Sequence, residues 1–242
     1  MIFIKNNEVE YTIINDDCFN VFESIKSNSI PLVVTDIPYG KVNRKSNGLR
    51  NLNKGEADIV NFDIKELVDK LCFICSGSIY IFCGTEQVSE IRKYMVENGM
   101  STRLCIWEKS NPSPMNGEYI WLSGIECCVF GKKRGATFNE HCKNTVWKYP
   151  CVRGAVHPTQ KPVSLIEYIV NTSSNVGDTV FDPFMGSGTT GIACLNSKRK
   201  FLGIEKNKEF FDIAYNRISK YKIEGCNNDK KTNATRRFNA TC

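Results

Sequence analysis

The chain has 242 residues, 41% of them apolar, a length that suits one sizeable α/β domain with a core of its own. Its formal net charge of +6 favours a polyanionic partner such as nucleic acid over an acidic metabolite, although charge alone does not establish one. No run of about 18 apolar residues and no basic segment followed by a long apolar stretch is present, so we expect neither a membrane span nor export.

Runs rich in β-branched and aromatic residues alternate along the chain with helical patterns. In chain order, we predict strands at residues 32–35, 78–83, 103–107, 125–130, 179–181 and 201–205. The clearest helical patterns cover residues 64–75, 87–98, 163–173, 189–197 and 208–221, with Pro162 suited to a first helical turn. This alternation predicts an α/β fold with a Rossmann-like, doubly wound, mostly parallel sheet.

Two stretches do not fit the alternation. Residues 41–57 are basic and contain glycine, and residues from about 110 to 154 are rich in Pro, Gly, Asn and aromatic residues. We interpret both as functional insertions in a single domain covering residues 1–225. Residues 226–242 are polar, basic and without periodicity, and we predict a disordered tail.

The twelve cysteines do not form a metal-binding or disulfide pattern. Several lie in apolar runs, where a reduced cysteine behaves as a small hydrophobic residue. Cys72 and Cys75 have CxxC spacing, but no second CxxC follows, and the chain has only two histidines. We therefore expect reduced thiols, a cytoplasmic protein and no metal site.

Gly186, Gly188 and Gly191 match the pattern G-x-G-x-x-G between a predicted strand and a predicted helix. Glycines at such a turn let a ligand approach the backbone closely. Glu205 ends the next predicted strand, where an acidic side chain can accept hydrogen bonds from both hydroxyls of a ribose. The arrangement predicts an adenosine cofactor, and the alternative is a tight connection without a ligand.

Asp182, directly before this turn, distinguishes between two kinds of adenosine cofactor. A carboxylate repels the pyrophosphate of a dinucleotide but attracts the ammonium of an aminoacyl group. Its position therefore favours S-adenosylmethionine over a dinucleotide.

The segment Asp36-Ile37-Pro38-Tyr39 follows a predicted strand and should project from the carboxyl edge of the sheet, where ligands bind in such folds. An amino group on an aromatic base is a poor nucleophile, and acceptors for its two hydrogens favour a pyramidal nitrogen. The Asp36 carboxylate and the Ile37 carbonyl can accept them, while Tyr39 can stack on an extruded base and Pro38 stiffens the turn. An ordinary aspartate–proline turn is the alternative.

Together these segments resemble the S-adenosylmethionine-dependent DNA amino-methyltransferases, whose catalytic motif is usually Asp-Pro-Pro-Tyr. The order, with the catalytic motif before the cofactor motif, is similar to that of their beta class. Residues 157–162, with the sequence HPTQKP, are a third match, and the resemblance covers residues 15 to 221. Ile37 replaces the usual second-position proline, but any residue supplies a backbone carbonyl, so we expect activity to be retained.

The resemblance also implies which residues contact the cofactor. Lys161 and Ser164 would bind its carboxylate, Asp182 and the following backbone its aminoacyl end, Glu205 its ribose, and Asp17-Cys18 its adenine. The full set is Asp17, Cys18, Lys161, Ser164, Asp182, Phe184, Met185, Gly186, Ser187, Gly188, Thr189 and Glu205. For Asp17 a plain turn residue is the alternative.

In this family, Asp in the first catalytic position is more usual for adenine, whereas Ser is common in enzymes that act on the amino group of cytosine. The resemblance therefore implies a bacterial or phage-encoded enzyme that flips an adenine out of double-stranded DNA and methylates it directly. Members of this class often dimerise, but no sequence feature here decides between a monomer and a homodimer.

Two groups of basic side chains are predicted to contact DNA phosphates. They are Lys41, Arg44, Lys45, Arg50 and Lys54 in the loop after the catalytic turn, and Lys132, Lys133, Arg134 and Arg153 in the second irregular stretch. This second stretch also contains Tyr119 and Trp121 and is the expected target-recognition region. A solvated basic loop and tryptophans buried in the core are the alternatives.

Four other functions are compatible with parts of the pattern. They are methylation of the cytosine amino group in DNA, methylation of an RNA base, DNA binding without catalysis, and an NAD-dependent reaction. The recognition sequence and the presence of a partner nuclease do not follow from the composition.

Overall fold

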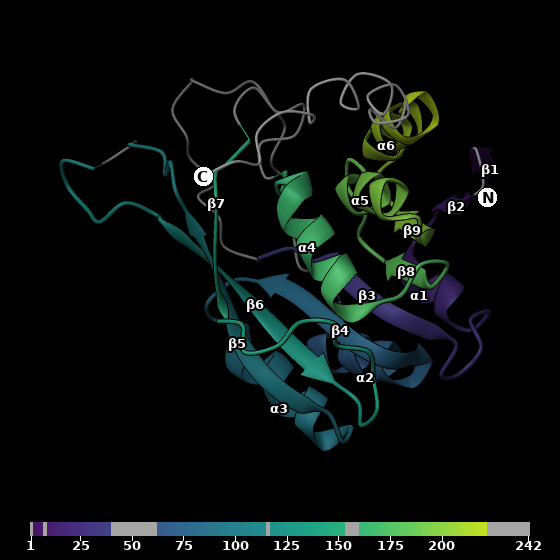
Figure 1. Cartoon of the computed structure of the whole chain (residues 1–242), viewed down its shortest axis with the longest axis horizontal. Coiled ribbons are helices and arrows are strands. Elements are labelled where there is room, and N and C mark those ends of the chain that lie inside the picture. Colours follow the sequence, from purple (N-terminus) through teal and green to yellow (C-terminus); the bar gives the residue numbers. More distant parts are fainter. Residues whose placement is uncertain (1, 7–8, 40–61, 115–116, 153–159, 222–242) are drawn as a thin grey trace, which may run out of the picture.

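The computed structural model describes residues 2–6, 9–39, 62–114, 117–152 and 160–221 (Figure 1). Its strands are β1 (Ile2–Asn6), β2 (Val9–Asn15), β3 (Ile30–Asp36), β4 (Cys75–Cys83), β5 (Ser101–Lys109), β6 (Ile125–Lys132), β7 (Val146–Tyr149), β8 (Thr179–Asp182) and β9 (Lys200–Glu205). Its helices are α1 (Cys18–Phe22), α2 (Ile64–Ile74), α3 (Val88–Glu97), α4 (Val163–Ser173), α5 (Thr189–Ser197) and α6 (Lys208–Lys220).

The described strands form one mixed sheet in the order β1-β2-β9-β8-β3-β4-β6-β5-β7. Strands β2, β9, β8, β3 and β4 run parallel to one another, and β6 is antiparallel to both β4 and β5. In this order β3 and β8 are neighbours, but β4, which follows β3 in the chain, lies on the far side of β3, and β9, which follows β8, lies on the far side of β8. The order therefore reverses between β3 and β8, and ligands bind beyond the carboxyl ends of the strands at such a point.

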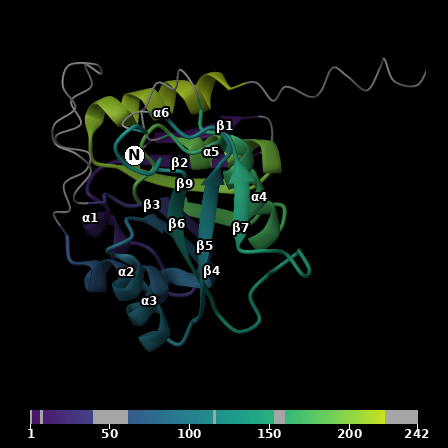
Figure 2. The ribbon, with the colours of Figure 1, turned by 90° about the vertical axis from the view of Figure 1, so that its left-hand side faces the viewer.

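Helices cover both faces of the sheet (Figures 1 and 2). Leu32 and Val34 of β3 belong to the core cluster under α4, α5 and α6, whereas Val33 belongs to the cluster under α1, α2 and α3. Successive side chains of a strand point to opposite faces. The continuous apolar run in β3 thus reflects a strand that is buried on both sides.

Local signals explain where several helices begin. The side chains of Asp63 and Asn207 accept hydrogen bonds from the backbone amides of the second and third residues of α2 and α6, as N-cap residues do. Gly188 is the N-cap of α5 and has a φ of 81°, in the left-handed region that favours glycine. None of the described helices is long and apolar enough to cross a membrane.

The six predicted strands and five predicted helices are all present, with bounds within a few residues of those expected. The α/β fold and the mostly parallel sheet are confirmed. The sequence patterns missed β1, β2, β7 and the short helix α1. The basic loop at residues 41–57 and the tail at residues 226–242 lie outside the described residues.

Part of the second irregular stretch belongs to the main sheet. Strands β6 and β7 lie within it, and both pair with β5 in the main sheet. What remains of the stretch in the described chain is the connection between β5 and β6, which extends away from the sheet in Figure 1, and the loop after β6.

Candidate active site

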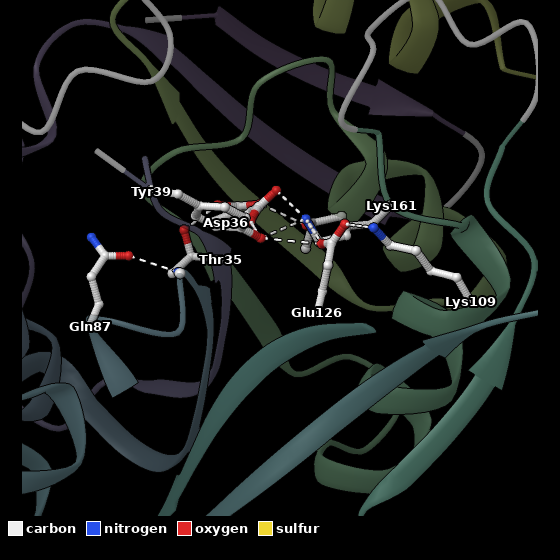
Figure 3. A network of polar contacts seen from close by, with 10 residues as sticks. Thr35, Asp36, Tyr39, Gln87, Lys109, Glu126 and Lys161 are labelled. Carbon is white, nitrogen blue, oxygen red and sulfur yellow. Dashed lines mark hydrogen bonds and ion pairs between the residues drawn. The ribbon is translucent and has the colours of Figure 1, made fainter. Parts of the chain in front are cut away.

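The turn after β3 is fixed by the neighbouring strand and by the residue before α3. The amide of Ile37 donates to the carbonyl of Phe82 at 3.1 Å, which extends the pairing of β3 with β4 by one residue. Gln87 donates from Nε2 to the Pro38 carbonyl at 3.0 Å, while its Oε1 accepts from the amide of Gly84 at 2.9 Å. These bonds hold Asp36 and Tyr39 at the carboxyl edge of the sheet (Figure 3).

Asp182 connects this edge of β3 to the glycine turn. Its Oδ1 accepts hydrogen bonds from the Thr35 hydroxyl at 2.9 Å and from the Phe184 amide at 3.2 Å. Its Oδ2 accepts from the Thr190 hydroxyl of α5 at 2.6 Å. The carboxyl is 4% exposed, and burial raises its pKa from 3.8 to about 7 despite these donors.

The glycines of the turn have different surroundings. Gly186 has a φ of 51°, and a Cβ there would meet nothing within 4 Å. A Cβ on Gly188 would lie 3.1 Å from Cβ of Ala214, and one on Gly191 would lie 2.7 Å from Ile218. Gly186 thus leaves open space at the turn, whereas Gly188 and Gly191 allow α5 to pack closely against α6.

Glu205 binds the other side of this turn. Its Oε2 accepts from the Gly186 amide at 2.9 Å and its Oε1 accepts from the Asn207 amide at 2.8 Å. A carboxylate oxygen can accept more than one hydrogen bond, so both atoms retain acceptor capacity. Burial raises the pKa of Glu205 above its ordinary value.

A pocket of about 990 Å³ joins the two turns. At one end it is lined by residues of the glycine turn together with Asp17, Cys18, Glu205 and Asn207, and at the other end by Asp36, Tyr39, Glu126 and Lys161. Its size lies within the range of sites that hold a cofactor-sized molecule.

The second end of the pocket contains a chain of paired charges (Figure 3). The ammonium of Lys161, whose side chain is 5% exposed, lies 2.5 Å from Asp36 Oδ2 and 2.9 Å from Glu126 Oε2. Lys109 lies 2.9 Å from the other oxygen of Glu126. The Tyr39 hydroxyl lies 2.8 Å from Asp36 Oδ1, 3.2 Å from Glu126 Oε2 and 3.2 Å from Lys161 Nζ.

The two carboxyl groups of this network differ in their titration. Burial raises the pKa of Asp36, and the attraction of Lys161 only partly offsets it. Burial also acts on Glu126, but Lys161 and Lys109 outweigh it and lower the pKa of Glu126. For Lys161, the two carboxylates outweigh burial and raise the pKa, so its ammonium stays charged.

A model of the N6/N4 DNA methylases matches residues 30–216. The chain is 26% identical to the type II methyltransferase M2.MboI of Moraxella bovis, over 89% of this chain and 90% of that protein. It is 30% identical to the type II methyltransferase M.HinfI of Haemophilus influenzae, over 89% and 70% of the two chains. The crystal structure of the M1.HpyAVI–SAM complex is 28% identical, with a TM-score of 0.67 over 86% of this chain and 99% of that one.

The chain belongs to the N6/N4 DNA methylase family. This methylase is therefore an S-adenosylmethionine-dependent enzyme that acts on an amino group of a DNA base, either N6 of adenine or N4 of cytosine.

The residues at the first end of the pocket fit an adenosine-containing cofactor. Gly186 leaves room at the turn, and Glu205 offers acceptors beside it. Asp17 lines the pocket while its side chain also caps α1 through the Phe19 amide and pairs with Lys206. Both interpretations of Asp17, as a turn residue and as a pocket residue, thus match its position.

Three other predicted cofactor residues of the methylase have surroundings that differ from those expected. Ser164 is exposed and is not among the residues that line the pocket, because Leu165 and Ile166 occupy the inward side of α4. Gly188 packs against α6 rather than lining the pocket. Lys161 lines the pocket, but its ammonium contacts Asp36 and Glu126 in this structure.

The basic residues at the C-terminal end of β6 in the methylase are far from the site. Lys132 pairs with Ser78, whereas Cys127 pairs with Cys83 next to the catalytic turn. Lys132 lies six positions after Glu126 along the strand, about 20 Å at the usual rise. Lys132, Lys133 and Arg134 thus lie toward the opposite edge of the sheet, because β6 runs antiparallel to β4. Lys41, Arg44, Lys45, Arg50, Lys54, Arg153 and His157 lie outside the described residues.

Sequence reasoning missed Glu126, Lys109 and Gln87. Glu126 had a usable signal, since it is a lone acidic residue in an apolar strand between Ile125 and Cys127. A charged side chain in such a run is rarely buried without a partner. Lys109 and Gln87 gave no comparable signal.

Proposed function

We propose that this methylase transfers a methyl group to N6 of adenine in double-stranded DNA after the base is extruded from the helix. The observation that supports this is the common pocket. Asp36 and Tyr39 at the end of β3 and the glycine turn after β8 line one cavity, joined by the bond from Thr35 to Asp182. The donor and the target amino group can therefore meet there.

Asp36 and Ile37 would act on the target amino group. The carboxylate of Asp36 and the backbone carbonyl of Ile37 accept its two hydrogens, which favours a nitrogen lone pair directed at the methyl group. Pro38 and the bond from Gln87 to the Pro38 carbonyl fix the backbone of this turn and therefore the direction of its acceptors. Tyr39 stacks on the extruded base. After transfer, the amino nitrogen releases one proton, and Asp36 is the nearby acceptor.

S-adenosylmethionine supplies an electrophilic methyl group on a sulfonium centre. Glu205 would accept hydrogen bonds from the ribose, and Asp17 and Cys18 would border the adenine. Asp182 together with Phe184, Met185, Gly186 and Ser187 would surround the aminoacyl end, with Thr189 behind the turn. The resemblance also assigns Lys161 and Ser164 to the carboxylate of the cofactor. In the structure, however, Lys161 contacts Asp36 and Glu126, and Ser164 does not line the pocket.

The choice of adenine rests on Asp36. Members of the family with Asp in this position more usually methylate adenine. The relatives M2.MboI and M.HinfI are named type II methyltransferases, so we also place the enzyme in a restriction–modification setting, with DNA as substrate.

DNA would approach over the mouth of the pocket. Lys109, Ser123 and Ile125 line the pocket where the connection between β5 and β6 begins and ends. This connection carries Tyr119 and Trp121, with exposed fractions of 87% and 96%. We propose that it contacts the duplex beside the extruded base, together with the basic loop at residues 41–57.

The test is transfer of labelled methyl from S-adenosylmethionine to unmethylated duplex DNA, followed by digestion to nucleosides. We expect N6-methyladenine. Asp36→Ala should lower turnover by about two to four orders of magnitude and leave cofactor affinity nearly unchanged, because the lost acceptor acts mainly in the transition state. Asp212→Ala, which removes an exposed carboxylate on α6, is the matched control.

Each other outcome has a definite meaning. If the product is N4-methylcytosine, the target base of the enzyme is cytosine and not adenine. Preference for RNA over duplex DNA, or cofactor binding without transfer, would overturn the proposed function. An equal loss of cofactor binding in Asp36→Ala would contradict the role of Asp36.

A further inference from the structure

Glu126 lies at the centre of the charged network although the proposed chemistry does not use it. It projects from β6 into the pocket, and its side chain is 20% exposed. Lys109 pairs with one of its oxygens at 2.9 Å, and Lys161 pairs with the other at 2.9 Å. Figure 3 shows its carboxylate between these two ammonium groups.

Glu126 and Asp36 share the same two hydrogen-bond donors. Lys161 lies 2.5 Å from Asp36 Oδ2, and the Tyr39 hydroxyl lies 2.8 Å from Asp36 Oδ1. Both donors are also within 3.2 Å of Glu126 Oε2. The Tyr39 hydroxyl has a single proton and can donate it to only one carboxylate at a time. The two carboxylates therefore compete for Tyr39 and Lys161.

We infer that Glu126 is a positioning residue that shares Lys161 and Tyr39 with Asp36, so that neither donor is held by Asp36 alone and the oxygens of Asp36 stay available to the target amino group. Lys109 fixes Glu126 from the far side and makes this arrangement neutral overall, with two carboxylates and two ammonium groups. The inference rests on the proposed role of Asp36 as the acceptor of the amino hydrogens.

The competition has a direct consequence for the pH dependence of turnover. The negative charge of Glu126 raises the pKa of Asp36, whereas Lys161 lowers it. Loss of Glu126 would remove the first effect and leave Lys161 to Asp36 alone, and both changes lower the pKa of Asp36. The groups that face Asp36 from the surrounding elements are Tyr39, Cys83, Glu126, Cys128, Lys161 and Asp182, and Lys109 acts through its contact with Glu126. The two thiols have raised pKa values and stay neutral.

The test is the variant Glu126→Gln, which keeps the size of the side chain and removes its charge. We expect kcat to fall about ten- to a hundredfold, with KM for DNA and cofactor affinity within about threefold of the parent values. The acid limb of the kcat–pH profile should move to lower pH, because Asp36 then loses its proton more readily. Glu126→Asp, which restores the charge, should recover part of kcat and return the acid limb toward its original position.

Glu108→Gln is the matched control, since it neutralises an exposed ion-paired glutamate on the adjacent strand β5. Lys109→Gln is a second variant that approaches Glu126 from the other side. It frees Glu126 to bind Lys161 more strongly, and it should therefore move the acid limb to higher pH, opposite to Glu126→Gln.

The inference is overturned if Glu126→Gln matches Glu108→Gln in kcat, or if its acid limb does not move. It is also overturned if both Glu126→Gln and Lys109→Gln move the limb in the same direction. These failures are distinct from failure of the proposed function, which would appear as absent adenine methylation in the parent enzyme or as full activity in Asp36→Ala.

Discussion

At the scale of single residues, Asp182 joins the two motifs that were recognised separately in the sequence. Its carboxyl group accepts hydrogen bonds from Thr35 of the catalytic strand, Phe184 of the turn and Thr190 of α5. Three donors lower the cost of burying a carboxylate but do not remove it, and the pKa remains raised to about 7. The residue thus connects the cofactor turn to the catalytic strand at some cost in stability.

This raised pKa predicts the pH dependence of stability. The folded pKa of about 7 exceeds the ordinary value of 3.8, so the folded protein holds a proton that the unfolded chain releases between these pH values. The free energy of unfolding should therefore fall as pH rises, by about 2–3 kcal/mol between pH 5 and pH 8 from this group. Asp182→Asn should flatten the dependence by that amount in urea unfolding of the cofactor-free protein, whereas Asp212→Asn should not. Equal slopes for Asp182→Asn and the parent would contradict the assignment.

At the scale of elements, two glycines of the turn before α5 have different roles: one leaves space for a ligand, and the other allows two helices to pack closely. Gly186 and Gly188 both have positive φ, but only Gly188 is pressed against another helix, at Ala214 and Ile218 of α6. The two positions therefore offer a matched pair of substitutions within one turn.

We expect Gly188→Ala to lower the free energy of unfolding by about 2–4 kcal/mol, from left-handed strain and overpacking together. Gly186→Ala should lower the free energy of unfolding by only about 1 kcal/mol, because the added methyl group meets no other protein atom. It should weaken cofactor binding by at least about tenfold, because the methyl group would occupy the space at the turn where the cofactor is proposed to bind. Calorimetric binding of S-adenosylhomocysteine and thermal unfolding measure the two effects. The reverse ranking would show that Gly186 does not face the cofactor.

The connection between β5 and β6 contains a tryptophan whose fluorescence can report DNA binding. Trp107 and Trp147 are buried, at 2% and 8% exposure, so Trp121 is the exposed tryptophan of the chain. Duplex DNA should protect its fluorescence from acrylamide, and Trp121→Ala should weaken DNA binding by about 1–3 kcal/mol if the ring stacks on a base. Unchanged quenching on addition of DNA would mean that the connection does not touch the duplex.

At the scale of the whole molecule, the direction of β6 places one of the two predicted groups of DNA-contacting basic residues away from the catalytic turn. The loop at residues 41–57 follows the catalytic turn directly, whereas Lys132 and Lys133 lie toward the opposite edge of the sheet. Only side chains that reach phosphates release counterions and steepen the salt dependence of DNA affinity.

The double variant Arg44→Ala with Lys45→Ala should therefore reduce the slope of log affinity against log salt by about 1–2. Lys132→Ala with Lys133→Ala removes the same net charge and should leave the slope unchanged. Fluorescence anisotropy on one duplex over a salt series measures both. A shallower slope in the second variant alone would move the DNA surface to the other edge of the sheet.

The sequence by itself determined the elements and motifs whose signals are local. The buried strand before Asp36, the strand–turn–helix around Gly186 and the helix at residues 163–173 follow from periodicity, capping and glycine spacing. Strands β1 and β7 escaped because they are short, and β2 and β7 also depend on pairing with the distant strands β9 and β5.

Only the tertiary structure decided how the charges of the site are paired. Lys161 lies 125 residues from Asp36 in the chain, yet the two form an ion pair, and Glu126 reaches both because β6 runs antiparallel beside β4. The same strand direction removes Lys132 from the pocket. Contacts of this kind depend on the order and direction of strands across the whole sheet, which local sequence patterns do not encode.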